Sequence, residues 1–78
     1  MIEDAQTLET AGRHMLATDN RSIQGHIYVG EAKYLQGKWS EALEQFTAAR
    51  AEFARQHPNS LERPQALNAR ISQILEKL

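Results

Sequence analysis

The chain has no cysteine, no run of like charge and no long apolar stretch. Without cysteine it can form neither disulfides nor thiolate metal sites, which fits a reducing compartment, so we expect a cytoplasmic protein. Nine basic and ten acidic residues are interleaved and form no basic patch for nucleic acid. The sequence lacks the roughly 18 consecutive apolar residues that would indicate a membrane span. Glu3 and Asp4 stand where a signal peptide carries positive charge, so none is expected.

Strand signals are also scarce, because sustained alternation of apolar and polar residues is missing and β-branched residues are few. Apolar residues instead recur every three to four positions. This periodicity predicts an all-α protein of four antiparallel helices, over about 2–18, 22–36, 39–56 and 62–77. The 78 residues allow a single small domain covering 1–78.

Local signals place the helix ends. Asn20 or Ser22 is expected to cap the second helix, and Gly37 to end it in a left-handed conformation. Pro58 is expected to end the third helix, because proline disfavours a helical residue before it. Gly12 lowers the helix propensity of the first helix and is expected there for close packing.

The second helix is apolar on more than one side. Val29 and Leu35 lie off the stripe formed by Ile23, Ile27 and Tyr34. Such a helix needs cover from two neighbours.

Small and aromatic residues recur at helical intervals from the second helix into the third, at Gly30, Tyr34, Gly37, Trp39, Ala42, Phe46 and Ala49. This pattern resembles one tetratricopeptide repeat at about 22–56, with the first and last helices as flanking or capping helices. The resemblance implies that Gly30 packs closely against Ala42, and Trp39 is expected in the core. His26 and Val29 depart from the family pattern.

The resemblance implies a protein–protein interaction module, a small adaptor or regulator that binds a peptide or helix of a partner protein. Its groove positions correspond to Ile27, Glu31 and Tyr34, and Arg63 and Arg70 on the last helix are expected to supply a polar rim. The alternative is that a neighbouring helix simply covers Ile27 and Tyr34.

The end of the chain is rich in apolar residues. Ile74, Leu75 and Leu78 are expected to mediate self-association as a two-fold homodimer. The alternative function is therefore a helical-bundle homodimer with a structural or regulatory, inhibitory role. The apolar stripe of the last helix can equally cover the third helix.

No pattern in the chain indicates an enzyme. The three histidines lack the spacing of metal ligands, and Glu31, Glu41 and Glu44 are typical of solvent-facing helix positions. A phosphate-binding glycine loop and a nucleophile elbow are both missing. We expect no catalysis, no cofactor and no metal. A small helical DNA-binding protein is a weaker alternative, because a basic recognition helix is lacking.

Overall fold

The described part of the chain folds into four helices, α1 (Ala5–Thr18), α2 (Ile23–Leu35), α3 (Trp39–Gln56) and α4 (Gln65–Lys77). The computed structural model describes residues 5–59 and 64–78, and these contain no strand. The predicted all-α class with four helices is therefore confirmed. The bounds of α2 and α3 agree with the prediction to within one residue. The predicted starts of the first and last helices lie outside the described residues.

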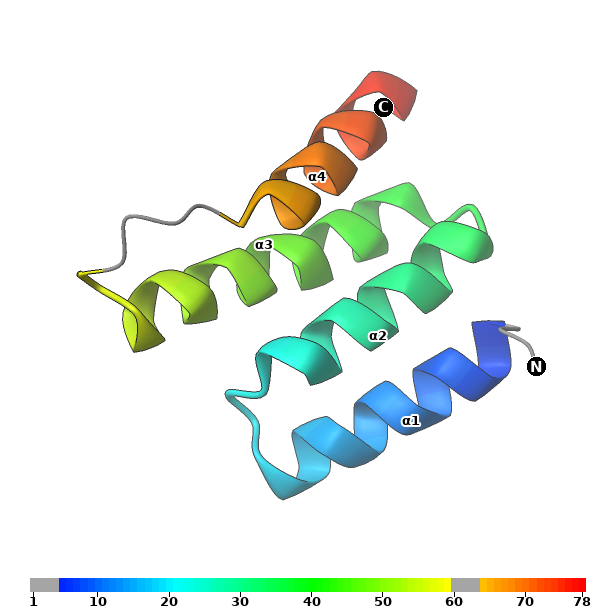
Figure 1. The fold of residues 1–78 in the computed structure, drawn as a ribbon. Helices are drawn as coiled ribbons and strands as arrows, with labels where there is room; N and C mark the ends of the chain where they lie inside the picture. The colour runs from blue at the N-terminus through cyan, green and yellow to red at the C-terminus, as the bar shows by residue number, and fades with distance from the viewer. Residues whose placement is uncertain (1–4, 60–63) are drawn as a thin grey trace.

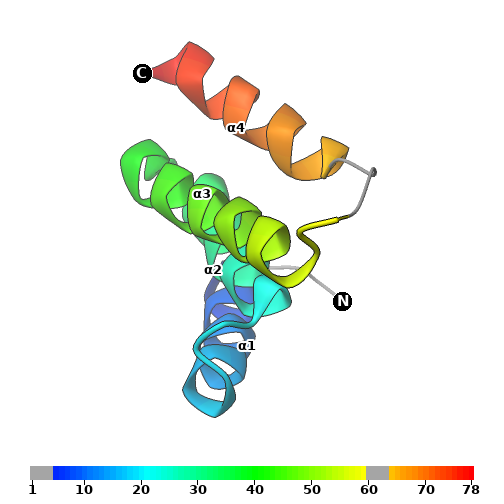
Figure 2. The same ribbon diagram turned by 90° about the vertical axis from the view of Figure 1, so that its left-hand side faces the viewer.

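The helices lie side by side in the order of the chain, and consecutive helices run in opposite directions (Figure 1). α1 packs on α2, α2 on α3 and α3 on α4, and no other pair of the described helices shares an extensive contact. The view turned by 90° places α1 and α4 at opposite ends of the row (Figure 2). The fold is therefore a stack of neighbours, and each end helix keeps one uncovered side.

The turn between α2 and α3 is closed by backbone hydrogen bonds around Gly37. The N–H of Gly37 donates to the carbonyl of Tyr34 at 3.0 Å, and the N–H of Lys38 donates to that of Lys33 at 2.9 Å. These two bonds form a Schellman motif, which requires a left-handed residue, and Gly37 has a φ of 75°. The predicted role of Gly37 is confirmed, and α3 folds back directly onto α2.

The other predicted helix ends are also found. Ser22 is the N-cap of α2, and its Oγ accepts a hydrogen bond from the N–H of Gly25 at 2.9 Å. This bond satisfies one of the free N–H groups at the start of the helix. α3 ends at Gln56, directly before His57 and Pro58.

α1 and α2 meet backbone to backbone at Gly12 and Gly25. A Cβ atom on Gly12 would lie 2.8 Å from the backbone nitrogen of Val29 and 2.9 Å from the carbonyl oxygen of Gly25. A Cβ atom on Gly25 would lie 2.9 Å from Cγ of Leu16. These distances leave no room for a side chain at either glycine. The expected role of Gly12 in close packing is confirmed.

The contact between α2 and α3 at Gly30 involves side chains instead. A Cβ atom on Gly30 would lie 3.0 Å from Cζ of Phe46 and 3.2 Å from Cβ of Gln45. The nearest neighbours of Gly30 are thus Phe46 and Gln45, ahead of the expected Ala42. The reason is size, because the Phe46 ring reaches the α2 backbone from one turn further along α3. Ala42 is fully buried nevertheless.

The main core lies between α3 and α4. It consists of the buried residues Ala42, Phe46, Ala49, Leu67, Ile71 and Ile74. Half-buried residues pack against it, namely Ile23, Ile27, Tyr34, Trp39 and Leu43. Trp39 therefore borders the core. The apolar stripe of α4 covers α3, as one of the two sequence interpretations predicted.

Alanine substitutions should distinguish the two glycine contacts. Gly12→Ala places its Cβ against backbone atoms that cannot move aside, so we expect a net loss of about 1–2 kcal/mol after the gain in helix propensity. Gly30→Ala meets a side-chain ring that can shift, and its unfolding free energy should stay within about 1 kcal/mol of wild type. Urea unfolding followed by circular dichroism measures both. Equal stabilisation by the two substitutions would contradict the backbone contact at Gly12.

Candidate functional site

Three residues predicted for partner binding, Glu31, Tyr34 and Arg70, come together between α2 and α4. Nη2 of Arg70 donates to Oε1 and Oε2 of Glu31 at 3.2 Å and 3.1 Å, and Nε donates to Oε2 at 3.2 Å. The guanidinium carbon lies 4.3 Å from the centroid of the Tyr34 ring. A planar guanidinium can pair with a carboxylate along its edge while its face rests on an aromatic ring.

The other two predicted residues do not join this cluster. Ile27 is half-buried and packs against the core between α3 and α4. Tyr34 packs there as well as contacting Arg70, so both apolar residues of the predicted groove are partly covered within the chain. Arg63 lies outside the described residues.

Trp39 extends the cluster with a second cation–ring contact. The centroids of Trp39 and Tyr34 lie 5.2 Å apart with their planes inclined at 72°, an edge-to-face pair. Nζ of Lys77 lies 5.2 Å from the centroid of the Trp39 ring. α4 therefore places two cations, seven residues apart, over two rings that touch each other. We call Glu31, Tyr34 and Trp39 the cation platform.

Sequence reasoning missed the part that Lys77 and Trp39 play in this cluster. Trp39 was expected only in the core, and Lys77 was not among the predicted site residues. The available signal was the spacing, because Arg70 and Lys77 lie two helical turns apart beside the apolar stripe of α4.

A second charged cluster joins α1, α2 and α3 around Lys33, which is only 8% exposed. Its Nζ lies 3.3 Å from Oε2 of Glu9 on α1 and 3.3 Å from Oε1 of Glu41 on α3. A buried lysine is rare unless it is paired. Each of the three helices contributes a charge, so the cluster fixes how α1 and α3 sit on α2.

Glu9 is surrounded by donors. Its carboxylate accepts hydrogen bonds from Arg13 at 2.6 Å, Gln36 at 3.3 Å and Lys33 at 3.3 Å. The hydrogen bond from Arg13, followed by those from Gln36 and Lys33, lowers the pKa of Glu9 from 4.5 to about 2. The carboxylate therefore favours the folded state at neutral pH.

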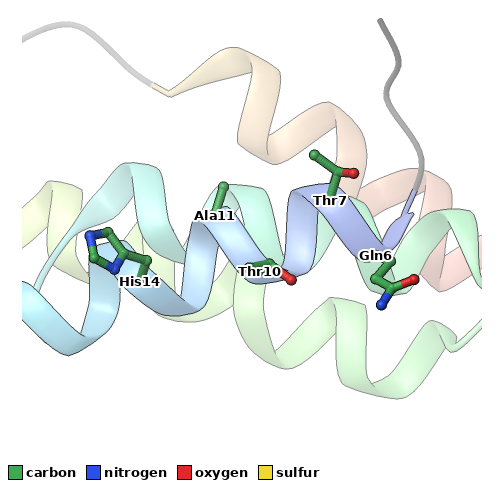
Figure 3. A pocket seen from close by; sticks show the side chains of 5 residues that line it. All are labelled: Gln6, Thr7, Thr10, Ala11 and His14. Carbon is green, nitrogen blue, oxygen red and sulfur yellow. The ribbon is translucent and has the colours of Figure 1, made fainter.

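The outer side of α1 carries a shallow hollow of about 610 Å³, open to solvent. Figure 3 shows the described side chains that line it spread along α1, namely Gln6, Thr7, Thr10, Ala11 and His14. They bring hydroxyl, amide and imidazole groups and no carboxylate or lysine. The arrangement suits surface contact better than proton transfer between converging groups.

The residues predicted for self-association divide into two kinds. Ile74 is fully buried in the core between α3 and α4, so its side chain is covered within the chain. Leu75 and Leu78 are 56% and 65% exposed. Leu35, at the end of α2, is also 56% exposed. The difference follows from the rotation of α4, which turns Ile74 toward α3.

The described histidines lie in separate surroundings. Nδ1 of His26 lies 2.9 Å from Oε1 of Gln45 on α3, and the ring of His57 contacts that of Phe53. Within residues 5–59 and 64–78, no group of three or more His, Asp or Glu side chains is placed to hold a metal ion. No helix in the same residues has the length and apolar character to cross a membrane.

Known proteins provide no match for this chain, whether as a family model, a curated protein or a solved structure. The resemblance of residues 22–56 to a tetratricopeptide repeat therefore rests on the residues of this chain alone.

Acid should weaken the fold through Glu9. A carboxyl group with a lowered folded-state pKa stabilises the fold above its unfolded-state pKa, and this stability is lost as the pH falls through the folded value. For Glu9 the loss runs from about pH 4.5 down to about pH 2. We expect the Tm of wild type to fall more steeply over this range than that of Glu9→Gln. Glu44→Gln, on the exposed side of α3, is the matched control and should follow wild type. Parallel curves for wild type and Glu9→Gln would contradict this role of Glu9.

Proposed function

We propose that this chain is a protein-binding module in which α2 and α3 form a tetratricopeptide-like helix pair flanked by α1 and α4. The stacking of the helices in chain order carries the proposal. A row of helices that pack mainly on their neighbours leaves extended faces on which another polypeptide can lie. A closed bundle would bury those faces in its own core.

Details of the helix pair support the tetratricopeptide-like part of the proposal. Ala42 and Ala49 have no exposed surface, and Phe46 lies between them on the buried side of α3. Gly30 gives the Phe46 ring room against α2, and Gly37 makes the tight turn that joins the helices. These positions carry the sequence resemblance, and each has a packing or backbone role in the helix pair.

The chemistry of the surface favours a polypeptide partner over a small substrate. The hollow on α1 is broad and open, and the cation platform consists of one carboxylate and two rings that meet edge to face. Helical stacks commonly receive an extended peptide or an amphipathic helix along their faces. We infer that the partner is a helical segment of another protein.

Selection from a peptide library tests the function. The full chain is immobilised and used to select from a displayed library of short amphipathic helices. Enriched peptides should bind in the micromolar range and should shift the amide NMR signals of a continuous face of the stack. For each peptide, a scrambled version of the same composition, with its apolar face dispersed, is the matched control.

If no peptide is enriched over its scrambled control, or if the shifted signals scatter over all four helices without forming a face, the chain is not a helix-binding module.

A second candidate function is a homodimer with a structural or regulatory role. The exposed Leu75 and Leu78 favour it, because they lie one turn apart at the end of α4 and leave an apolar surface uncovered. A second copy bringing the same two leucines would bury them across a two-fold axis.

Light scattering after size exclusion tests the dimer. If it forms, the mass should approach twice the monomer value as concentration rises, and the double variant Leu75→Glu/Leu78→Glu should remain a monomer. Ala69→Glu/Ser72→Glu adds the same charges to exposed positions on the same helix and should still dimerise. A wild-type chain that stays monomeric at every concentration eliminates this candidate.

A further inference from the structure

α4 lies on the rest of the chain in the way that a bound amphipathic helix lies in a groove. Its buried residues form one stripe, Leu67, Ile71 and Ile74, at spacings of four and three. This stripe packs against α3, and Arg70 beside it reaches across to α2. α4 is covered on one side only, since it stands at the end of the row (Figure 2).

The surface beneath α4 is suited to receive a helix. Along α3, Ala42 and Ala49 are small buried residues on either side of the large Phe46, and all three belong to the core cluster that contains Leu67, Ile71 and Ile74 of α4. The cation platform borders this surface, with Glu31 and Tyr34 from α2 and Trp39 from the start of α3.

The platform selects for charge at two points. Glu31 receives the guanidinium of Arg70 through three hydrogen bonds, and the Tyr34 ring lies under the same group. The Trp39 ring faces Lys77 seven residues later. A carboxylate and the faces of two rings all favour positive charge and disfavour negative charge. Glu31 and Tyr34 require the planar guanidinium of an arginine, which can pair with the carboxylate and lie on the ring at once. Trp39 can receive either a lysine or an arginine.

We propose, building on the function given above, that the surface of α2 and α3 under α4 is the partner-binding site and that α4 is its internal occupant. The partner is an amphipathic helix of the same chemistry, which takes the place of α4. It carries apolar residues at i, i+4 and i+7, an arginine at i+3 and a second cation at i+10. In this chain those positions are held by Leu67, Ile71, Ile74, Arg70 and Lys77.

An internal occupant sets the affinity for the partner. α4 is tethered to the surface of α2 and α3, so it competes with the partner helix at a high effective concentration. The partner can bind only those molecules in which α4 has left this surface. The apparent dissociation constant is the intrinsic one divided by that fraction. Weakening the hold of α4 without altering α2 or α3 should therefore tighten binding of an added helix.

The test uses the full chain as receptor and a fluorescein-labelled peptide of residues 64–78 as probe. In the receptor, Ile71→Glu puts a charge into the buried stripe of α4 and leaves the receiving surface unchanged. Fluorescence anisotropy should give a dissociation constant at least about tenfold lower for this receptor than for wild type. The receptor Arg70→Ala/Lys77→Ala keeps the apolar stripe and should bind at least about threefold more tightly than wild type, which covers the case in which Ile71→Glu does not fold.

Peptide variants test the charge selection on the Ile71→Glu receptor, or on the double-alanine receptor if the first does not fold. A peptide with Arg70→Lys should bind about fivefold more weakly than the unmodified one, because it keeps the charge and loses the fork. A peptide with Lys77→Arg should bind as well as the unmodified peptide. When the receptor also carries Glu31→Gln, the unmodified peptide and the Arg70→Lys peptide should have nearly the same dissociation constant.

Two results would overturn the proposal. One is a folded receptor with weakened α4 that binds the probe no better than wild type. The other is a peptide lacking both cations that binds as tightly as the unmodified one. If either occurs while library peptides still bind another face of the stack, the protein-binding function stands and only the role of α4 falls. If library peptides also fail to bind, both fall.

Discussion

The fold depends on α2 being covered on two sides at once. On one side its backbone touches that of α1 at Gly25, and on the other Gly30 makes room for the Phe46 ring of α3. Two glycines within one helix each cost about 1 kcal/mol of helix propensity relative to alanine. A helix of this length is marginal in isolation, so its stability comes from the neighbours that these glycines admit. α2 is therefore both the least self-sufficient helix and the one that holds the others.

The charged side chains of α2 serve the same purpose. Lys33 turns toward α1 and α3, where Glu9 and Glu41 meet it, while Glu31 turns toward α4 and Arg70. Apolar contacts alone allow neighbouring helices to slide and rotate at little cost, because the hydrophobic effect has no direction. Ion pairs with defined geometry add direction. These three carboxylates and two cations thus act as fixed points between α2 and the other three described helices.

Much of this fold could be read from the sequence, and the limits are physical. Periodicity located the helices, Ser22 and Gly37 marked the ends of α2, and its two-sided apolar character indicated two neighbours. The rotation of each helix about its axis could not be predicted from the sequence, because it depends on many side-chain contacts that form together when the helices pack. That rotation decides that Gly30 lies closest to Phe46, and that Ile74 is buried while Leu75 is exposed.

The candidate site was predicted in part for the same reason. Glu31, Tyr34 and Arg70 were identified as surface groups, but their pairing with one another depends on where α4 lies across α2. Trp39 was assigned to the core and Lys77 to no site, since their contact joins residues far apart in the chain. Features that depend on a single helix can thus be predicted from the sequence, whereas side-chain contacts between two helices cannot.

The order of the stack has a consequence for cooperativity. Because the extensive contacts of each helix are with the next one along the chain, stability passes mainly from neighbour to neighbour, as in a one-dimensional lattice. Most contacts then join residues close in sequence, a topology associated with rapid folding. Either terminal helix can fray while the central pair keeps its interface, so amide protection should rise from the ends of the row toward α2 and α3.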